Sequence, residues 1–455
     1  MATVSHTRKF PDSLVLLFAL IVLAQVATYL LPAGEFEREG HHVVPGTYHE
    51  VDAGPLPIQT FLTAIPTGLA AAQDIIFFVF VVGGVIAVVR ATGAIDALIG
   101  GAIRYMSHGP AVLIFGMVVL FAVGSSTVGM AEEYMPFVPI LVTMCLAMRV
   151  DAVVAVGIIY VGAGVGYACA AINPFTVLIA QQIAGVELMS GQGFRWGLLL
   201  VCTAIGADHI LRYVRQVQSD PAASLVADVD YSTGFRMPED VEFTPRRVTV
   251  LLVFVASIVG FVYGIGAWGW YLTELVAVFM ALGLAAALVG GLGPDRVAAE
   301  FCQGAAELTK TALLIGFART IEIVLTEGQV IDTVINGLAQ PLDGLPRELS
   351  AIGMLGVQTV CNFFIPSGSG QAYVTMPIMA PLSDLTALSR QTAVLAYQFG
   401  DGFTNMIVPT NALLMGILAL AKIPYQRWVR FVWPLLVKLY IVAILALLAA
   451  VWFGY

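Results

Sequence analysis

Apolar segments long enough to cross a lipid bilayer recur along the whole chain and alternate with short polar stretches. A transmembrane helix needs about 20 mostly apolar residues to span roughly 30 Å of hydrocarbon. The first such segment covers residues 12–32, and the one long polar stretch covers residues 214–246. The pattern predicts a single all-α membrane domain over residues 1–455, in which residues 214–246 form a linker rather than a second domain.

Basic residues orient the predicted helices, because Lys and Arg near helix ends accumulate on the cytoplasmic side. Arg104 and Arg149 lie on the same side by this rule, so residues 109–148 must enter the membrane and return. Their midpoint, GSSTVGMAEE, is polar and contains glycine, which suits the tip of a re-entrant hairpin. Two ordinary crossings joined outside the membrane are the alternative, and they would leave Glu132 and Glu133 in a surface loop.

Two of the predicted crossings contain helix-breaking residues near their middle. Residues 151–185 include the run GAGVGYACAAINPFT, and residues 391–421 include GDGFTNMIVPTN. Proline removes a backbone hydrogen-bond donor and glycine weakens a helix, so both segments are predicted to be broken helices. We therefore expect unpaired backbone groups at the depth where each helix is interrupted.

The second half of the chain repeats the order of elements in the first half, starting from the opposite side of the membrane. IDALIGG at residues 95–101 is similar to IDTVING at residues 331–337, and each is followed by a polar-tipped segment and a broken helix. We predict two inverted-topology repeats on this basis. Repeat one covers about residues 57–195, with a hairpin at 109–148 and a broken helix at 151–185; a cytoplasmic linker covers about 214–246; repeat two covers about 295–425, with a hairpin at 349–388 and a broken helix at 391–421.

The predicted architecture is thus an all-α polytopic membrane protein with about nine transmembrane helices, two re-entrant hairpins and two broken helices. Its N-terminus lies in the cytoplasm and its C-terminus on the periplasmic side. Inverted repeats with interrupted helices are typical of secondary transporters, whose substrate site lies near the membrane midplane. Exchange between two nearly equivalent arrangements of the repeats would give alternating access.

The composition excludes a soluble globular protein and argues against a nucleic-acid partner. Of the 455 residues, 59% are hydrophobic and 11% are charged, and the mean hydropathy is +0.90. The formal net charge of -9 is spread over loops, without a run of Lys and Arg. The five cysteines occur singly in apolar segments, which predicts neither a disulfide framework nor a zinc site. No cofactor is predicted apart from a coupling ion, Na+ or H+.

Small polar residues at the hairpin tips and helix breaks form the predicted site. Freed carbonyl groups at one half-helix end can bind a cation, and N–H groups at the other can bind an anion. Hydroxyl and amide oxygens suit a hard cation such as Na+, while helix capping and helix packing are the alternative roles. The uncharged candidates for substrate binding are Ser125, Ser126, Thr127, Asn173, Thr176, Ser367, Ser369, Gln371, Asn405, Thr410 and Asn411. Those for Na+ are Ser125, Asn173, Ser367, Thr404 and Asn405.

Charged residues inside the apolar segments complete the candidate site. Asp401 lies about ten residues, or roughly 15 Å, into a predicted crossing, where an ionised carboxylate is costly and usually faces a cavity or a partner. It could bind a substrate amine, help to hold Na+ or carry a proton, and a structural pair with an arginine is the alternative. Arg319 lies midway along another predicted helix and can bind a carboxylate in a bidentate manner. Glu322, three residues later, offers an intrahelical ion pair instead.

With Glu132 and Glu133 at the first hairpin tip, the predicted site holds more acids than bases. This excess favours a positively charged cargo, whether a substrate amine, a coupling cation or both. We expect a zwitterionic or cationic amino acid, with its carboxylate bound by Arg319 or a hairpin tip and its amine bound by one of the acids. A C4-dicarboxylate carrier is the alternative, and it would need hairpin N–H groups, hydroxyls or Na+ to meet the second negative charge.

Other function classes are less consistent with the motifs. The sequence contains neither HExxH nor GxxxxGK[ST], and the GAGVGY run lies inside a predicted membrane crossing rather than between a strand and a helix. We therefore predict that the chain is not an enzyme and that an ion gradient or a counter-substrate supplies the energy. An ion channel is the competing class.

Four long motifs carry a resemblance to a known family. GMAEEYMPFVPI, GAGVGYACAAINPFTVLIAQQIAG, FFIPSGSGQAYVTMPIMAPL and QFGDGFTNMIVPTNALLMGILALAKIPY resemble the anaerobic C4-dicarboxylate carrier family, in its YfcC-like branch, within the ion transporter superfamily. The resemblance implies a scaffold domain and an elevator-type transport domain, commonly as a homodimer in the bacterial inner membrane. It also implies transport of small organic acids or amino acids, by ion coupling or by exchange.

The hairpin tips depart from the pattern of that superfamily. Its better-understood members carry a Ser-Asn-Thr tripeptide at each tip, whereas the tips here read Ser125-Ser126-Thr127 and Ser367-Gly368-Ser369. The dicarboxylate contacts that the resemblance implies therefore do not transfer residue by residue.

Overall fold

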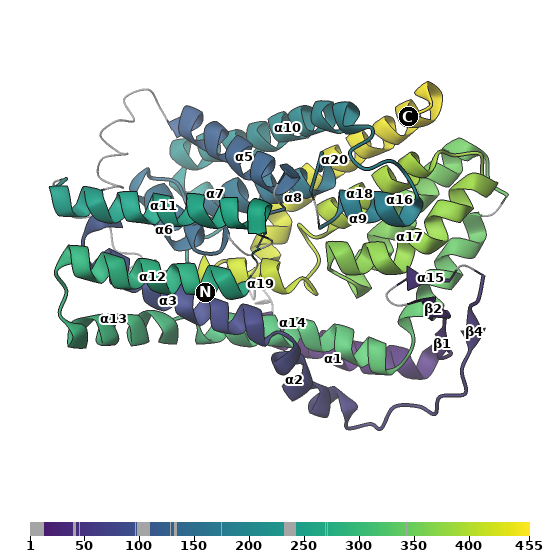
Figure 1. Ribbon diagram of the computed structural model, residues 1–455, viewed down its shortest axis with the longest axis horizontal. Coiled ribbons are helices and arrows are strands. Elements are labelled where there is room, and N and C mark those ends of the chain that lie inside the picture. Colours follow the sequence, from purple (N-terminus) through teal and green to yellow (C-terminus); the bar gives the residue numbers. More distant parts are fainter. Residues whose placement is uncertain are drawn as a thin grey trace, which may run out of the picture.

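The fold is described from a computed structural model of the chain, and it is built almost entirely from helices, as the hydrophobic pattern predicts. The helices form two layers that lie along the long axis of the molecule (Figure 1). The structure describes residues 13–39, 42–44, 46–95, 97, 110–127, 129–131, 134–173, 175–231, 243–268, 270, 272–342 and 344–455.

Most of the first layer lies in the lower half of Figure 1. In it α3 packs against α12 and α13, α14 packs against α1 and α2, and α11 packs against α12. These helices are α1 (Ser13–Leu30), α2 (Thr60–Ala71), α3 (Gln73–Ala91), α11 (Pro245–Trp268), α12 (Leu272–Gly290), α13 (Pro294–Ala306) and α14 (Thr309–Glu327).

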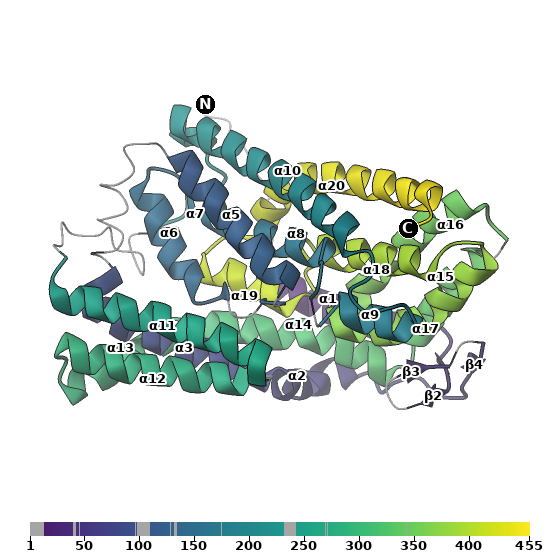
Figure 2. The same cartoon turned by 45° about the horizontal axis from the view of Figure 1, so that its top comes forward.

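The second layer surrounds one buried helix, α18, which packs against α8, α9, α16, α17 and α20. Figure 2 shows α10 and α20 along the side of this layer that faces away from the first layer. Its α-helices are α5 (Pro110–Thr127), α6 (Phe137–Ala147), α7 (Ala152–Val156), α8 (Gly162–Ala168), α9 (Val177–Ala184), α10 (Gln192–Ser219), α15 (Ile331–Ala339), α16 (Arg347–Phe364), α17 (Gly368–Leu385), α18 (Arg390–Thr404), α19 (Ala412–Leu420) and α20 (Tyr425–Phe453). A π-helix, η3 (Gly157–Val161), joins α7 to α8, and two 3-10 turns are η4 (Pro221–Ala223) and η5 (Gln340–Leu342).

Four helices in the described part of the chain are long and apolar enough to cross a membrane, judged by length and composition. They cover Gln73–Ala91, Gln192–Ser219, Thr273–Gly290 and Tyr425–Phe453. Large apolar side chains on these helices, such as Leu200, Leu288 and Leu445, are exposed, which suits contact with lipid. The total of about nine crossings stays a prediction.

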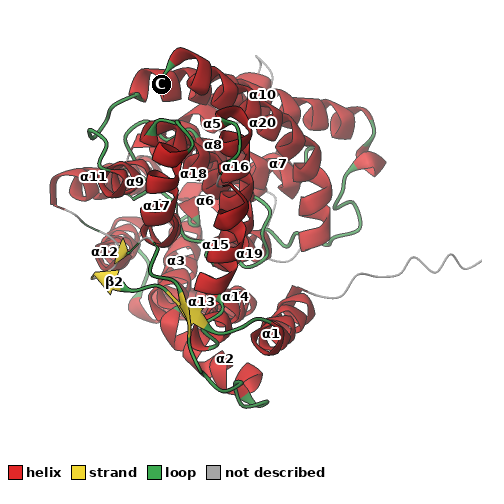
Figure 3. Cartoon of the chain, turned by 90° about the vertical axis from the view of Figure 1, so that its right-hand side faces the viewer, coloured by secondary structure: helices red, strands yellow, loops and turns green. Residues whose placement is uncertain are grey.

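Between α1 and α2 the chain forms two short antiparallel β-ladders, which the all-helical prediction did not include (Figure 3). Asp332 at the start of α15 anchors them, because its buried carboxylate accepts hydrogen bonds from the Arg38 guanidinium at 2.6 and 2.8 Å and from the Phe36 N–H at 3.1 Å. The paired strands are β1 (Gly34–Glu35) with β4 (His49–Glu50), and β2 (Arg38–Glu39) with β3 (His42–Val43).

Side-chain caps begin several helices of the second layer, as expected for Ser, Asp and Asn before a helix. Each cap accepts a hydrogen bond from an N–H in the first turn that lacks a partner within the helix. The pairs are Asp151 with the N–H of Val154, Ser367 with that of Gly370, Ser389 with that of Thr392, and Asn411 with that of Leu414.

The first broken helix is interrupted later than its glycine run suggests. Gly162, Gly164 and Gly166 lie within α8, and the interruption follows the end of α8 at Ala168 and precedes the start of α9 at Val177. A Cβ on Gly166 would overlap the α5 backbone at Ala122, so this glycine permits close helix packing that offsets its weak helix propensity.

The second broken helix is interrupted between Thr404 and Ala412. The glycines of GDGF precede this interruption and lie within α18, where Gly402 allows close approach to α8. A Cβ on Gly402 would overlap the backbone nitrogen of Ala168. The two broken helices therefore cross in contact, immediately beside both interruptions.

The carbonyl groups freed at both interruptions accept hydrogen bonds from buried side chains. Unpaired carbonyl groups would be costly in an apolar interior. The donor–acceptor pairs are Gln398 to Ala170 at 3.1 Å, Arg195 to Ala171 at 3.4 Å, Tyr160 to Asn405 at 3.2 Å, Trp428 to Met406 at 2.8 Å and Tyr425 to Ile407 at 2.6 Å.

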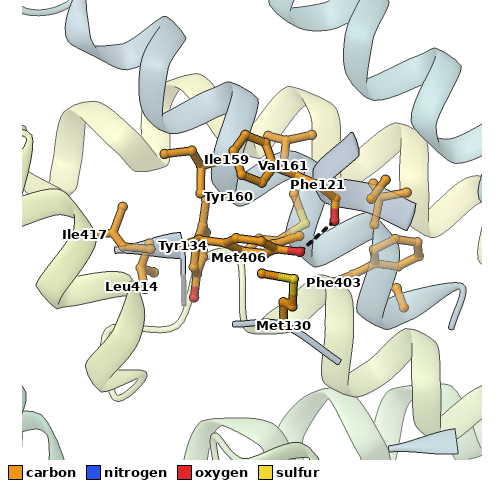
Figure 4. Close-up of a cluster of buried hydrophobic side chains, with 14 of the residues drawn as sticks. Phe121, Met130, Tyr134, Ile159, Tyr160, Val161, Phe403, Met406, Leu414 and Ile417 are labelled. Carbon is orange, nitrogen blue, oxygen red and sulfur yellow. Dashed lines mark hydrogen bonds between the residues drawn. The ribbon is translucent and has the colours of Figure 1, made fainter. Parts of the chain in front are cut away.

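An apolar cluster packs between α5 and the two broken helices (Figure 4). Phe121 of α5 and Tyr134 pack edge to face with ring centroids 4.8 Å apart, and the Tyr134 hydroxyl donates to the Phe121 carbonyl oxygen at 3.0 Å. Figure 4 shows Tyr160 and Met406, from the two broken helices, in the same cluster. The end of α5 and both interruptions thus share one core.

Arg390 at the start of α18 clamps three helices outside this core. Its guanidinium donates to both carboxylate oxygens of Asp384 near the end of α17 and, at 2.9 Å, to the carbonyl oxygen of Ala184 at the end of α9. The hydrogen bond from Arg390 lowers the pKa of Asp384 below its usual range.

We predict that Gly402→Ala destabilises the protein by about 1–3 kcal/mol, because the added methyl group must force α18 away from the α8 backbone. Gly356→Ala on α16 is the control, since nothing lies within 4 Å of the added Cβ and alanine is the better helix former. Thermal unfolding of the purified variants measures the effect. Equal stability of the two variants would contradict the close crossing.

Candidate functional site

A cavity of about 360 Å³ lies between the two layers, where both helix interruptions face α14. Its volume suits a small organic molecule. The first layer contributes Ala71, Ala72, Asp74, Ile75, Arg319 and Glu322. The second layer contributes Gly129, Ala131, Tyr160, Ala163, Gly164, Tyr167, Phe175, Thr176, Pro366, Ser367, Gly368, Ser369, Gly402, Asn405, Met406, Thr410, Asn411, Ala412 and Leu413.

All charged side chains in the described lining belong to the first layer. Arg319 and Glu322 lie one turn apart on α14 and form an ion pair. This is the intrahelical pair that the sequence offers as the alternative to ligand binding by Arg319. Arg319 also lines the cavity, and a guanidinium has five N–H donors, so the pair leaves donors for a ligand. Glu322 additionally lines a neighbouring cavity of about 430 Å³ beside the β-ladders.

Asp74 is the third charged residue of this wall, in the first turn of α3. Its side chain is exposed to the cavity and forms no hydrogen bond or ion pair with any residue that the structure describes. Asp74 is not among the site residues that the sequence predicts. Its position directly after the α2–α3 junction is the signal that could have identified it.

The opposite wall presents hydroxyl and amide groups instead of charges. Six predicted residues line it directly: Thr176, Ser367, Ser369, Asn405, Thr410 and Asn411. Two of them also hold the chain in place, since Asn411 caps α19 and donates to the Asn405 side-chain oxygen at 2.6 Å, while Thr410 donates to the Phe363 carbonyl oxygen at 2.8 Å. Structural and ligand-facing roles therefore coincide at the second interruption.

The N-terminus of α17 opens into the cavity beside Thr176. The side chain of Ser367 caps this helix by accepting from the Gly370 N–H, and the N–H groups of Gly368 and Ser369 are in the first turn, where no acceptor exists within a helix. The Thr176 hydroxyl is buried and has no hydrogen-bond partner among the residues that the structure describes. These groups together can accommodate a carboxylate at a helix N-terminus.

Asp401 lies behind this wall and is 1% exposed. Its Oδ1 atom accepts hydrogen bonds from the side-chain amides of Asn362 at 3.1 Å and Asn405 at 2.8 Å. No arginine or lysine in the described part of the chain forms an ion pair with it, so the predicted alternative of a structural Asp–Arg pair is not what the geometry shows.

Gly368 in the cavity lining also lies close to Asp401. A Cβ on Gly368 would lie 3.2 Å from the Oδ2 atom of Asp401 and 2.6 Å from the Cγ2 atom of Thr176. The Tyr397 hydroxyl donates to the Gly368 carbonyl oxygen at 2.6 Å and holds the backbone there. The missing side chain thus brings the cavity lining close to the carboxylate.

A chain of buried amides extends from Asp401 into the interior. Asn362 donates to the side chain of Gln371 at 3.0 Å, and Gln371 donates to the Gln358 side chain at 2.7 Å. The predicted residue Gln371 is therefore part of the support for Asp401 and does not line the cavity. Asn362 and Gln358 were not predicted, because their positions inside an apolar helix carry no local signal.

Other predicted residues stabilise the protein locally and lie outside the cavity lining. Ser125 and Thr127 donate to carbonyl oxygens of Met130 and Val123, and the Ser126 hydroxyl accepts from the Ala171 N–H. These three residues end α5, so the polar tip begins later than the sequence suggests.

Asn173 and Thr404 also act as local supports. Asn173 donates to the Ser125 carbonyl oxygen at 2.9 Å and accepts from the Phe175 N–H at 2.8 Å, which is the capping alternative. Thr404 forms a 2.6 Å hydrogen bond with the Tyr440 hydroxyl. Glu132 and Glu133 lie outside the described residues, although Gly129 and Ala131 on the same connection line the cavity.

Comparison with known proteins matches residues 10–452 to the family described as C4-dicarboxylate anaerobic carrier, DcuC. The chain is 32% identical to an Escherichia coli (strain K12) protein named "Putative basic amino acid antiporter YfcC", over 99% of this chain and 98% of that protein. It is 30% identical to a Haemophilus influenzae protein over 94% of each.

Two solved structures are similar at a lower level. The Alcanivorax borkumensis YdaH transporter has a TM-score of 0.44 and 13% identity, covering 98% of this chain and 99% of that chain. Neisseria gonorrhoeae MtrF has a TM-score of 0.40 and 18% identity, covering 98% and 96%. TM-scores of this size carry no argument about function.

We predict that Thr176→Val leaves the free energy of unfolding unchanged to within about 0.5 kcal/mol, because the hydroxyl that it removes has no partner. Thr375→Val is the matched comparison, since the buried Thr375 hydroxyl has two acceptors within hydrogen-bond distance, the Gln371 carbonyl oxygen at 2.8 Å and the Gln358 side-chain oxygen at 3.0 Å. It should destabilise the protein by about 1–3 kcal/mol. Thermal unfolding of both variants tests this, and an equal loss would mean that Thr176 is a structural residue.

Proposed function

This chain belongs to the C4-dicarboxylate anaerobic carrier family, and on that premise we propose that this membrane transporter moves a small amino acid or organic acid by secondary active transport. The energy comes from a Na+ or H+ gradient or from exchange of a counter-substrate. The cavity between the two layers carries the proposal, because it joins both helix interruptions to a wall of charged side chains. Interrupted helices at a central site are the usual construction of a secondary transporter.

The packing of the helices supports inverted repeats with an elevator-type movement. In the proposed repeats α2 corresponds to α13, and α3 corresponds to α14. In the first layer α2 packs on α14 and α13 packs on α3, so the first helix of each repeat packs on the second helix of the other. In the second layer, α5 packs on α8 and α16 packs on α18, again as corresponding pairs. We propose that the first layer is the scaffold and that the second layer moves along it with the substrate.

An amino acid is the substrate class that the cavity favours. Its described lining holds two carboxylates, Asp74 and Glu322, and one guanidinium, Arg319. A substrate with a carboxylate and an amine can be met by Arg319 or the N-terminus of α17 at one end and by an acid at the other. The name of the Escherichia coli relative, "Putative basic amino acid antiporter YfcC", agrees with this class.

A C4-dicarboxylate is the second candidate, and the family description favours it. Its two negative charges would need Arg319 and the first-turn N–H groups of α17 together, with Na+ offsetting the excess of acids. An ion channel is the competing class, and saturable counterflow distinguishes a carrier from a pore.

Asp401 is the proposed coupling group, as a Na+ ligand or a proton carrier. It is a buried carboxylate beside an interruption, and only one of its oxygens accepts hydrogen bonds from described residues. A carboxylate without a cationic partner at such a depth is costly unless a cation or proton joins it. By resemblance we further propose a homodimer in the bacterial inner membrane, with a cytoplasmic N-terminus and a periplasmic C-terminus.

Counterflow in proteoliposomes tests the transport proposal. Vesicles loaded with unlabelled lysine or succinate should accumulate the labelled form of the true substrate transiently, because a carrier exchanges substrate across the membrane. A pore would give no transient accumulation with either amino acids or dicarboxylates, and its flux would not saturate.

We predict that Asp401→Asn lowers uptake driven by an imposed Na+ or H+ gradient at least about tenfold. The amide carries no negative charge to attract a cation and has no proton that it can release near neutral pH. Asp208→Asn is the control, because Asp208 forms an exposed ion pair with Arg212 on α10. Gradient-driven uptake by Asp401→Asn at the level of the Asp208 variant would make Asp401 a structural residue.

A further inference from the structure

The charges around the cavity are distributed unequally between its walls. Described second-layer residues in the lining carry only hydroxyl, amide, phenol and apolar groups, whereas the first layer supplies Asp74, Arg319 and Glu322. Arg319 and Glu322 neutralise each other in an ion pair on α14. Asp74 is therefore the uncompensated charge of the described lining.

Asp74 is also positioned to meet a ligand. It stands in the first turn of α3, where the junction with α2 opens toward the cavity, and its carboxylate has no hydrogen-bond or ion-pair partner among the described residues. Across the cavity lie the Thr176 hydroxyl, which is buried without a partner, and the N-terminus of α17. One wall thus offers a free negative charge and the other offers hydrogen-bond donors.

We infer that Asp74 binds the cationic group of the substrate and selects for it. The substrate class is then an amino acid whose side chain carries an ammonium or guanidinium group, with its carboxylate directed toward the opposite wall. This inference rests on the proposed function, and it narrows the substrate class at the same cavity. A dicarboxylate would be repelled by the same group.

Asp74 has an ordinary structural role that must be separated from this one. A carboxylate in the first turn of a helix interacts favourably with the helix dipole, so its removal lowers stability whatever the cavity binds. Asp295 occupies the same position in α13 and lies outside the described cavity lining. Asp295→Asn therefore removes an equivalent helix-terminal charge without touching the proposed site.

Binding measurements on the full-length protein in lipid nanodiscs test the inference with three probes. Lysine carries the side-chain cation, norleucine is its uncharged counterpart, and succinate is a dicarboxylate. Isothermal titration is compared for the wild type and for Asp74→Asn, Asp74→Glu and Asp295→Asn. Thermal unfolding in the absence of ligand shows whether each variant is folded.

We expect Asp74→Asn to weaken lysine binding about tenfold or more, as for the loss of one charge-assisted contact. Norleucine binding should stay unchanged, succinate binding should not weaken, and both Asp74→Glu and Asp295→Asn should keep the affinity for lysine. In the wild type, the preference for lysine over norleucine should fall as salt is raised. This salt dependence tests the inference on the wild type alone, so the test stands even if Asp74→Asn does not fold.

Different failures have different meanings. Unchanged lysine binding in a folded Asp74→Asn variant, or an equal loss in Asp295→Asn, overturns the role of Asp74 and leaves the proposed transport function standing. A lysine preference that is independent of salt overturns the role of Asp74 as well. Binding of succinate by the wild type, with neither lysine nor norleucine bound, overturns both the inference and the proposed amino-acid substrate.

Discussion

The interrupted helices are possible only because buried side chains replace the hydrogen bonds that the backbone loses. Each peptide group left unpaired in an apolar interior is costly. Trp428 and Tyr425 of α20 donate to carbonyls of the second interruption, and Gln398 of α18 donates to the first. Asn173 accepts a hydrogen bond from the Phe175 N–H, and Asn411 accepts one from the Leu414 N–H. The positions of α8, α9, α18 and α19 all depend on these bonds.

Satisfying the interruptions internally leaves the remaining polar groups free to face the cavity. The Thr176 hydroxyl has no hydrogen-bond partner among the described residues, and it lies with the N-terminus of α17 opposite the ion pair of α14. The neutral wall belongs to the layer that contains the interruptions, and the charged wall belongs to the other layer. A relative movement of the layers would therefore change the charge that a bound molecule meets.

Helix breakers predict interruptions within residues 151–185 and 391–421, and the gaps between α8 and α9 and between α18 and α19 lie in these segments. Within the run GAGVGYACAAINPFT the glycines lie inside α8 and serve helix packing, because close helix approach offsets the weak helix propensity of glycine. Asn405, Thr410 and Asn411 line the cavity as a site prediction requires, whereas Ser125 and Asn173 hold the backbone. The same residue types perform both tasks, so composition alone does not separate them.

The sequence by itself determined the helical membrane class, the two interrupted segments and the burial of Asp401, because hydropathy and helix breakers act over a few neighbouring residues. Only the tertiary structure decided which polar groups meet. The partnership of Asn362 with Asp401 joins residues 39 positions apart, and the alignment of Asp74 with Arg319 brings two separate helices to one cavity. Such contacts depend on how helices pack across the whole chain, and no local pattern encodes them.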